Sequence, residues 1–457
     1  MFQSVELPVW LFVLILLFAG VTFASHFLFP SVRWFFRRRM EHAVARLNER
    51  LPRPIEPFKL ARRADTIQRL IYDRDVLAAV AEHAKAEGVP EAVAHERAER
   101  YAREIVPSFS ASAYFGFGTR ASKWLSKLIY KVRVDVVDEE RLNRIDPDAA
   151  VVFVMNHRSN MDYVLVTWLV SQRSALSYAV GEWARIWPLS TLIRSMGAFF
   201  IRRKSRNALY RKVLARYVQM ATQGGVAQAV FPEGGLSLDG KVALPKLGFL
   251  NYIVSGYQPG GRDVVFIPVA LNYDRVLEDR VLIAADEAGE RRFRASIPTA
   301  LRFTFRQLVR MLRGRFHRFG TAAVYFGAPF SLATFPGGEP QTLTKRVGQE
   351  LNTRIESVMP VLPVPLIASI LQDRGALSRT DLIAETSTRL AKLSAYGARL
   401  PTKEESPDEI VDAGLRVLTL RRIVQIEGDL ISPVKHETST VAFYANTIRH
   451  LIDRAEA

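Results

Sequence analysis

The sequence predicts an α/β protein in which helices cover a mixed β-sheet, with a transmembrane helix before this domain and helical regions on both sides of it. Short segments of β type alternate with helix-like segments from Lys131 onward, which is the order of an α/β fold. Outside that part, apolar residues recur at helical spacing. These observations divide the chain into an anchor, a helical accessory region, an α/β domain and a C-terminal helical region: residues 1–35, 36–130, 131–341 and 342–457.

The composition limits the class of protein. The chain has 457 residues, of which 49% are hydrophobic, so it can bury a large core, and global disorder is excluded. It contains no cysteine, which excludes disulfides, thiolate metal sites and a cysteine nucleophile. The formal net charge of +17 predicts an anionic partner. Because the basic residues follow no nucleic-acid-binding motif, we expect phospholipid headgroups or a phosphorylated substrate.

An apolar run near the amino terminus predicts a single membrane span. Residues 7–30 contain no Asp, Glu, Lys or Arg and, as a helix, are long enough for a hydrocarbon core of about 30 Å. A cleaved signal peptide is the alternative, although no positive charge precedes the run. By the positive-inside rule, the arginines that follow place the rest of the chain on the cytoplasmic side of the inner membrane: Arg33, Arg37, Arg38 and Arg39.

The sequence of the accessory region predicts a small helical bundle. Its apolar residues recur three and four positions apart, and prolines and glycines interrupt it early and late: Pro52, Pro54, Pro107, Gly116 and Gly118. Two roles fit such a bundle, a cover for the site of the next domain or a spacer after the anchor.

Polar residues follow two of the predicted strands. The strand segments are KVRVDVV, AAVVFVM, ALSYAVG, GAFFIRR, VAQAVFP, VVFIPVA and TAAVYFG, and the run from Asn207 to Gly224 is helix-like. His157 comes directly after the second strand and Glu233 after the fifth. Chemistry in α/β folds lies in the turns at strand ends. We therefore expect these two side chains to share one cleft.

The spacing between His157 and Asp162 predicts a general base. A carboxylate five positions beyond the imidazole can fold back and bind one ring nitrogen, which leaves the other nitrogen free to take a proton. The alternative is a helix amino terminus capped by Asn156 or Ser159. Ser159 as a nucleophile is disfavoured because it lies on the same turn as His157. A metal site of His157, Asp162 and Glu233 offers too few ligands, and we expect no metal.

Three further segments accompany NHRSNMDYVLV along the chain. They are GAFFIRRK (197–204), FPEGGLSLDGK (231–241) and IPVALNYDRV (267–276). In this order the four segments resemble the sequence blocks of the glycerol-3-phosphate acyltransferase family, within the HX4D-type glycerolipid acyltransferase superfamily. The resemblance covers roughly residues 132–330 and implies the glycerolipid acyltransferase fold. It also implies His157 as the catalytic base, Asp162 as its orienting partner and Glu233 as the third member of the catalytic set.

Basic residues of the second block are the expected phosphate ligands. Guanidinium groups recognise phosphate in a bidentate manner. By resemblance, Arg202 and Arg203 bind the phosphate of the acceptor. A solvated strand end or a lipid-facing patch is the alternative for Arg203 and Lys204.

The third block departs from the family pattern. Gly234 lets the backbone approach a ligand closely, and Ser237 is retained, but Leu236 and Leu238 stand where the family has arginines. This departure leaves the identity of the acceptor open. Two lysines nearby are candidates to replace the missing cations: Lys241 and Lys246.

Two more segments have a predicted role. In the fourth block, Asp274 and Arg275 either act in the site or pair with one another. Arginines recur at helical spacing within residues 301–320, which predicts an amphipathic basic helix there: Arg306, Arg310 and Arg313. Such a helix suits either an anionic bilayer surface or a solvated face.

The combined expectation is a membrane-anchored acyltransferase of phospholipid biosynthesis. It would move a fatty acyl group from an acyl thioester, either acyl-CoA or acyl carrier protein, to the sn-1 hydroxyl of glycerol 3-phosphate, without a cofactor. Its partners would be this acceptor, the thioester and an anionic membrane. Two alternatives stay open, a 1-acylglycerol-3-phosphate or other lysophospholipid acyltransferase, and a catalytically silent membrane-binding homologue. Donor type, chain length, oligomeric state and the role of the C-terminal region stay open as well.

Overall fold

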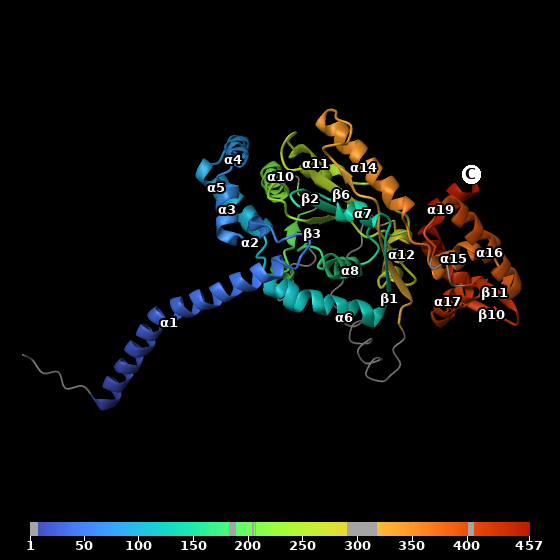
Figure 1. Cartoon of the computed structure of the whole chain (residues 1–457), viewed down its shortest axis with the longest axis horizontal. Coiled ribbons are helices and arrows are strands. Elements are labelled where there is room, and N and C mark those ends of the chain that lie inside the picture. Colours follow the sequence, from blue (N-terminus) through green and yellow to red (C-terminus); the bar gives the residue numbers. More distant parts are fainter. Residues whose placement is uncertain (1–7, 182–188, 203–204, 206, 290–317, 401–405) are drawn as a thin grey trace, which may run out of the picture. The chain divides into compact units, whose positions relative to one another are not determined.

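The computed structural model describes residues 8–181, 189–202, 205, 207–289, 318–400 and 406–457. These residues form two compact units, Met1–Pro54 and Ile55–Ala457. The first unit contains one helix, α1 (Val9–Asn48), which continues beyond the expected end of the anchor (Figure 1). Among the described residues, no helix has the length and apolar character needed to cross a membrane. Because residues 1–7 and the side chains of 23–37 are not described, the span expected at residues 7–30 stays a prediction.

The second unit is built around the mixed sheet that the sequence predicts. The strand order is β1-β7-β6-β2-β5-β3-β4, and β8 pairs with β6. Each of the seven expected strand segments forms a strand, and β8 is added: β1 (Lys131–Val136), β2 (Ala150–Met155), β3 (Ser177–Gly181), β4 (Phe199–Ile201), β5 (Gln228–Val230), β6 (Val264–Tyr273), β7 (Thr321–Phe326) and β8 (Phe330–Ser331).

The strand directions bring the predicted site residues to one edge of the sheet. Strands β6, β2, β5, β3 and β4 are parallel neighbours, whereas β7 and β8 run antiparallel to β6. The carboxyl ends of β6, β2 and β5 therefore lie side by side. His157 follows β2 and Glu233 follows β5, so the expected convergence of the two strand ends is confirmed.

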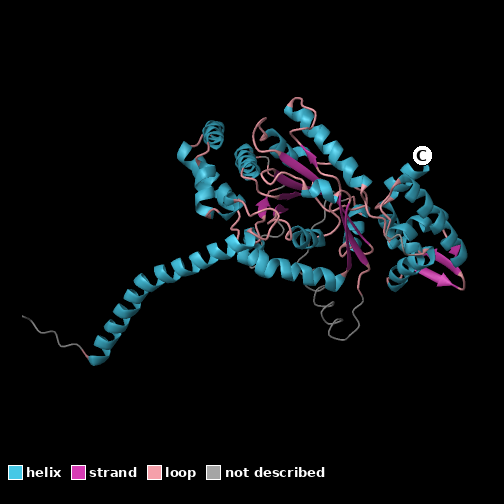
Figure 2. Ribbon diagram, in the orientation of Figure 1, coloured by secondary structure: helices cyan, strands magenta, loops and turns pink. Residues whose placement is uncertain are grey.

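Helices cover the sheet in two packed groups, with the strands between them (Figure 2). In one group, α6 (Thr119–Ile129) packs on α8 (Met161–Val170). In the other, α11 (Leu247–Ser255) contacts both α10 (Ala208–Gln223) and α14 (Pro340–Ser357). Helix α10 is the predicted helix after the second block, and the Asn207 side chain caps it by accepting a hydrogen bond from the Tyr210 N–H. Shorter helices complete this part: α7 (Glu139–Asn143), α9 (Leu189–Ser195) and α12 (Asp279–Glu287).

The accessory region forms a bundle that packs on α10. Its helices are α2 (Pro57–Leu60), α3 (Arg63–Ile71), α4 (Arg74–Glu87) and α5 (Glu91–Ile105). Arg216 of α10 donates hydrogen bonds of 2.8 and 2.6 Å to Asp73, which caps α4. The interruption expected at Gly116 and Gly118 is a π-helix, η1 (Ser112–Gly118), that leads directly into α6.

The C-terminal region is not purely helical. A small antiparallel sheet, ordered β10-β11-β9, accompanies its helices. Gly428, at φ +63°, makes the tight turn between the two hairpin strands. The elements are α15 (Pro363–Arg374), β9 (Leu377–Ser378), α16 (Arg379–Tyr396), α17 (Pro407–Leu420), β10 (Val424–Glu427), β11 (Leu430–Pro433), η3 (Lys435–Glu437), α18 (Thr438–Asn446) and α19 (Arg449–Glu456). The basic helix expected at residues 301–320 falls almost entirely outside the described residues.

Gly240 provides a test of how the C-terminal region docks. A Cβ at Gly240 would lie 1.9 Å from the Phe443 carbonyl oxygen, and its φ is +84°. We expect Gly240→Ala to lower the free energy of unfolding by about 2–4 kcal/mol, through overpacking and backbone strain together. Denaturant unfolding measures this loss.

Gly428→Ala is the matched control. Gly428 also has a positive φ, but a Cβ there would meet nothing within 4 Å. Only the backbone strain remains, so we expect a loss of about 1 kcal/mol. Equal losses for the two variants would contradict close docking of α18 on Gly240.

Candidate active site

Asn156 fixes the start of the turn that carries His157. Its side-chain amide donates a hydrogen bond of 2.9 Å to the Leu271 carbonyl and accepts one of 2.8 Å from the Leu271 N–H. The side chain thus continues the pairing between β2 and β6 by one residue after β2 ends. Because Asn156 is buried and doubly bonded, the backbone enters the turn in one direction.

His157 and Asp162 form the predicted pair. His157 Nδ1 lies 2.9 Å from Asp162 Oδ2, and both side chains are buried. Asp162 sits in the first turn of α8, where backbone N–H groups favour a negative charge. The spacing predicted this contact, and the geometry confirms it.

Asp162 receives three more hydrogen bonds. The backbone N–H groups of Arg158 and Ser159 donate to Oδ2 at 2.7 and 3.0 Å, and the Tyr273 hydroxyl donates to Oδ1. With so many donors converging on it, the carboxylate acts as acceptor, and Nδ1 of His157 therefore carries the proton. The other ring nitrogen, Nε2, has the lone pair that a general base requires.

Aromatic rings hold the imidazole in place. The Phe231 ring lies 4.2 Å from the His157 ring, centroid to centroid, at 31°. The Tyr163 ring meets His157 edge-on at 5.3 Å. These contacts restrict rotation of the imidazole, so the direction of Nε2 is set by packing as well as by Asp162.

Glu233 joins the same turn from β5. Its Oε1 accepts a hydrogen bond of 3.0 Å from the backbone N–H of His157. Its Oε2 is buried and has no hydrogen-bond partner among the described residues. Burial raises the pKa of Glu233 to about 7, although the nearby Arg158 guanidinium and the His157 N–H act in the opposite direction. The described part of the site therefore leaves one buried carboxyl oxygen without a hydrogen bond.

Arg158 is a component of the site that the sequence analysis did not single out. The side chain is 1% exposed, and its Nη1 donates hydrogen bonds to the carbonyls of Gly240 and Lys241. Its Nε and Nη2 atoms are buried without a partner in the described part of the chain. Burial lowers the pKa of Arg158, whereas the charge of Glu233 opposes that shift. Arg158 thus connects the His157 turn to the third block.

Ser159 has a structural role. Its hydroxyl donates a 2.7 Å hydrogen bond to Glu278 Oε2 and accepts one of 3.1 Å from the Met161 N–H. The Asn160 amide also donates to Glu278, at 3.0 Å. These contacts therefore do not support Ser159 as a nucleophile. Glu278, which lies 119 residues beyond Ser159, carried no local signal in the sequence.

The third block brings several of the expected residues together. Gly234 has φ +69°, and a Cβ there would meet the Lys246 side chain at 2.9 Å. Lys246 Nζ donates a 2.7 Å hydrogen bond to the Glu233 carbonyl. Ser237 is buried, and its hydroxyl donates to the Lys241 carbonyl at 2.8 Å, so it stabilises the loop. The Lys241 side chain is exposed.

In the described chain, no group of three or more His, Cys, Asp or Glu side chains is arranged to hold a metal ion.

Arg202 lies at the same carboxyl ends of the parallel strands as His157 and Glu233, but it forms an ion pair with Glu104. It follows the edge strand β4, two strands from β5, which is roughly 10 Å at the usual strand spacing. Nε and Nη2 bind Glu104 of α5, with a shortest distance of 2.6 Å. Nη1 is outside this ion pair. Arg203 lies outside the described residues.

Of the two alternatives for Asp274 and Arg275, the pairing with one another is wrong. Asp274 is buried and accepts hydrogen bonds from the backbone N–H groups of Thr321 and Val364, at 2.7 and 3.0 Å. The Arg275 guanidinium lies over the Phe319 ring, 3.8 Å from its centroid. Asp274 therefore joins β6 to β7 and to the C-terminal region.

The C-terminal region holds the turn after β6. The Tyr444 hydroxyl donates to Asp279 and accepts hydrogen bonds from the Val276 N–H at 3.1 Å and from Arg421 at 2.8 Å. Arg280 forms an ion pair with Glu437. Glu278, the residue that fixes the His157 turn, lies within this clamped segment.

The same region also reaches the third block. Asn446 Nδ2 donates a 2.9 Å hydrogen bond to the Asp239 carbonyl, beside the close approach of Gly240 to Phe443. Asn272 at the end of β6 donates to the Pro360 carbonyl at 2.9 Å. Helices that are remote in sequence thus support both sides of the site.

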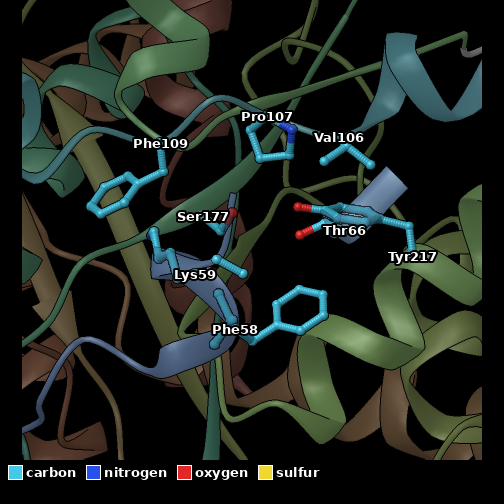
Figure 3. Close-up of a pocket in the computed structure, with 10 residues that line it drawn as sticks. Phe58, Lys59, Thr66, Val106, Pro107, Phe109, Ser177 and Tyr217 are labelled. Atoms are coloured by element: carbon cyan, nitrogen blue, oxygen red, sulfur yellow. The ribbon is translucent and has the colours of Figure 1, made fainter. Parts of the chain in front are cut away.

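A small pocket around Lys59 lies at the other end of the strands (Figure 3). Ser177, the first residue of β3, lines it, so the pocket is at the amino ends of the parallel strands. Its volume is about 30 Å³, which is room for one water and not for a substrate. Lys59 donates a 2.8 Å hydrogen bond to the Ala175 carbonyl, and burial lowers its pKa well below the ordinary value. This pocket is separate from the candidate active site.

Two family models match the chain. An acyltransferase model matches residues 133–272, and a model of the glycerol-3-phosphate acyltransferase C-terminal region matches residues 304–454. The first range contains β2, β5, all of β6 except Tyr273, and the side chains of His157, Asp162 and Glu233. The part of the fold that holds the candidate site is thus the part that resembles the acyltransferase model.

Curated proteins named glycerol-3-phosphate acyltransferase are similar to most of this chain. Glycerol-3-phosphate acyltransferases of Shewanella loihica and Aeromonas hydrophila are 27% and 26% identical over 86% of this chain and over 51% and 50% of their own lengths. The Xanthomonas campestris protein of that name is 27% identical over 84% of the chain and 46% of its length. The chain therefore spans about half the length of the curated relatives it matches. The resemblance to the glycerol-3-phosphate acyltransferase family is confirmed.

A solved structure also matches in part. The crystal structure of a 1-acyl-sn-glycerophosphate (LPA) acyltransferase, PlsC, from Thermotoga maritima matches with a TM-score of 0.31 at 22% identity. The match covers 53% of this chain and 80% of that one.

The pKa of Glu233 predicts a pH-dependent effect of Glu233→Gln. The folded protein holds the Glu233 proton up to about pH 7, whereas the unfolded chain releases it near the ordinary value of 4.5. Wild type therefore loses stability as pH rises through this window, by about 3 kcal/mol at most. Glutamine does not titrate, so Glu233→Gln should gain stability relative to wild type between pH 4.5 and 7. Denaturant unfolding over that range measures the difference.

Glu437→Gln is the control, because its effect on stability should change with pH in the opposite direction. Burial alone would raise the pKa of Glu437, but the ion pair with Arg280 lowers it overall. Its contribution to stability is present above pH 4.5 and is lost as pH falls through the lowered pKa. Relative to wild type, this variant should be least stable near neutral pH. A Glu233→Gln difference that does not change with pH would contradict the raised pKa.

Proposed function

We propose that this chain transfers a fatty acyl group from an acyl thioester to the sn-1 hydroxyl of glycerol 3-phosphate, as a step of phospholipid biosynthesis. The observation that carries the proposal is the His157–Asp162 pair at the carboxyl edge of the sheet, in an acyltransferase domain. The names of the curated relatives support glycerol 3-phosphate as acceptor. Acyl-CoA and acyl carrier protein are both suitable thioester donors.

The reaction follows from the orientation of His157. Nε2 removes the proton of the acceptor hydroxyl while the hydroxyl oxygen attacks the thioester carbonyl. The carbon–sulfur bond then breaks, and the thiol leaves readily because its pKa is about 8.5. Asp162 stabilises the imidazolium that forms, and the proton passes from His157 to the departing sulfur. The step requires neither a covalent enzyme intermediate nor a cofactor.

Glu233 is suited to hold the acceptor. Its unpartnered Oε2 is buried beside the His157 turn and can bind a second hydroxyl of the acceptor, as a donor when Glu233 is protonated and as an acceptor when it is ionised. Lys246 lies at the same turn, and Arg202 lies further along the sheet edge. These cations are the candidates to bind the phosphate.

A lysophospholipid acyltransferase is the second candidate function. Leu236 and Leu238 are half-buried in the third block, where the family has arginines. An apolar wall at this position suits an acceptor that already carries an acyl chain. A catalytically silent homologue is the third reading, which the intact His157–Asp162 pair and Glu233 disfavour.

The expected location is the inner membrane, with the enzyme unit facing the cytoplasm. The uncharged run at residues 7–30 and the arginines after it support this placement. The substrates are consistent with it, because an acyl thioester is made in the cytoplasm and the product is a membrane lipid.

An acceptor panel tests the proposed function. Purified protein is supplied with one radiolabelled acyl thioester and with glycerol 3-phosphate, 1-acylglycerol 3-phosphate or glycerol. We expect ester formation with glycerol 3-phosphate, and His157→Ala should reduce its rate by at least about a hundredfold because the positioned base is lost. A clear preference for the acylated acceptor would favour the second candidate. Turnover that survives His157→Ala would exclude His157 as the base.

A matched pair of variants tests the phosphate role of Arg202. If Arg202 binds the acceptor phosphate, Arg202→Ala should raise the acceptor KM by roughly ten- to a hundredfold and leave the thioester KM nearly unchanged. Glu104→Gln removes the same ion pair but keeps the guanidinium, so the acceptor KM should stay near that of wild type. If both variants raise the acceptor KM equally, Arg202 supports the fold instead.

A further inference from the structure

Helix α6 presents aromatic and basic side chains at the surface and buries small ones. Its buried residues are Ser122 and Ser126, whereas Trp124 is 61% exposed. Its apolar residues follow a helical row that is half-buried or exposed: Ala121, Trp124, Leu125 and Leu128. A helix that only covered the core would turn this row inward. The apolar face of α6 therefore has a purpose beyond packing on α8.

Positive charge borders this apolar row. Residues 106–134 contain no Asp or Glu. Arg120, Lys123 and Lys127 recur at helical spacing, and all three are exposed. Together with Arg318, they border a surface groove of about 430 Å³ that also contains Trp124 and Leu128. Aromatic and aliphatic side chains thus lie among cations, with no acid in that stretch of sequence.

Neighbouring elements extend the apolar area. Phe117, near the end of η1, is 61% exposed. Helix α9 contacts η1 and exposes Leu189 and Leu192. We call the following residues the α6 surface: Phe117, Arg120, Lys123, Trp124, Lys127 and Leu128.

The chemistry of the α6 surface selects its partner. A second copy of the chain would bring the same cations against one another across a symmetric interface, which is unfavourable. In a bilayer with anionic headgroups, aromatic rings enter the interfacial layer while lysine and arginine stems extend toward the phosphates. Each cation near such a surface adds to the attraction.

We propose that the α6 surface lies against the interfacial layer of an anionic phospholipid bilayer. Because α6 packs on α8, which carries Asp162 in its first turn, this contact places the bilayer one helix away from the catalytic pair. The contact would bring the site near the membrane that receives the product, and this consequence alone rests on the proposed function. The surface itself is argued from exposure and charge.

A single fluorescent label tests the contact in the full chain. The chain has no cysteine, so Phe117→Cys provides one attachment point for an environment-sensitive dye. Leu420→Cys on α17 is the control, because Leu420 is 57% exposed and is not part of the α6 surface. The labelled proteins are mixed with vesicles of phosphatidylcholine alone or with vesicles of phosphatidylcholine and anionic phosphatidylglycerol.

We expect a change in dye fluorescence only at position 117 and only with anionic lipid. The dye at position 117 should shift to shorter wavelength with the anionic vesicles, and salt should reverse the shift. The dye at position 420 should not respond. This readout requires no turnover, so its outcome is independent of whether glycerol 3-phosphate is the acceptor.

Charge variants in the Phe117→Cys background complete the test. The triple variant Arg120→Gln, Lys123→Gln and Lys127→Gln should shift the equilibrium away from the docked state by on the order of a hundredfold, at roughly fivefold for each cation. The control variant removes three exposed cations from the accessory helices α3 and α4: Arg69→Gln, Arg74→Gln and Lys85→Gln. It should retain the shift.

Three outcomes would overturn the proposal. The first is no shift with anionic vesicles while the protein sediments with them. The second is an equal loss of the shift in both triple variants. The third is a shift that appears without lipid and grows with protein concentration, which would assign the surface to a second copy of the chain.

Discussion

Asp162 is the acceptor around which the site is organised. Its two oxygens receive hydrogen bonds from the His157 imidazole, from two backbone N–H groups of the turn and from the Tyr273 hydroxyl of β6. A buried carboxylate with fewer donors would be costly to keep ionised. The same hydrogen bonds that stabilise its charge also close the turn, join α8 to β6 and fix the imidazole. Local structure, tertiary packing and chemistry therefore depend on one group.

The support for this group extends in layers across the second unit. Asn156 fixes the backbone just before His157, Glu233 accepts a hydrogen bond from the His157 N–H, and Glu278 accepts hydrogen bonds from Ser159 and Asn160. Glu278 in turn belongs to a segment that Tyr444 clamps from the C-terminal region. Each layer is hydrogen-bonded, and its supporting residues are buried except for the half-buried Glu278, so the imidazole is held in one orientation. The C-terminal helices are thus part of the architecture of the site.

The sequence predicted those parts of the structure that have a local cause. Apolar runs such as that before His157 predicted the strands, and the spacing between His157 and Asp162 predicted their contact. The partners of Asp162 and Ser159 could not be found in this way, because Tyr273 and Glu278 lie 111 and 119 residues further along the chain. The hairpin of β10 and β11 was missed because its strands are short and largely exposed. Arg202 was assigned to phosphate from its position, whereas its contact with Glu104 depends on how the accessory bundle packs.

The distances along the chain between these partners bear on how the protein matures. The contact between Asn446 and the third block spans 207 residues, and that between Tyr444 and Asp279 spans 165. During synthesis the strands that carry His157 and Glu233 emerge well before the helices that clamp them. Contacts of such long range form slowly, because loop-closure entropy opposes them. A nascent chain would thus hold an incomplete site until the segment that contains Tyr444 and Asn446 has been made and has docked on the rest of the second unit.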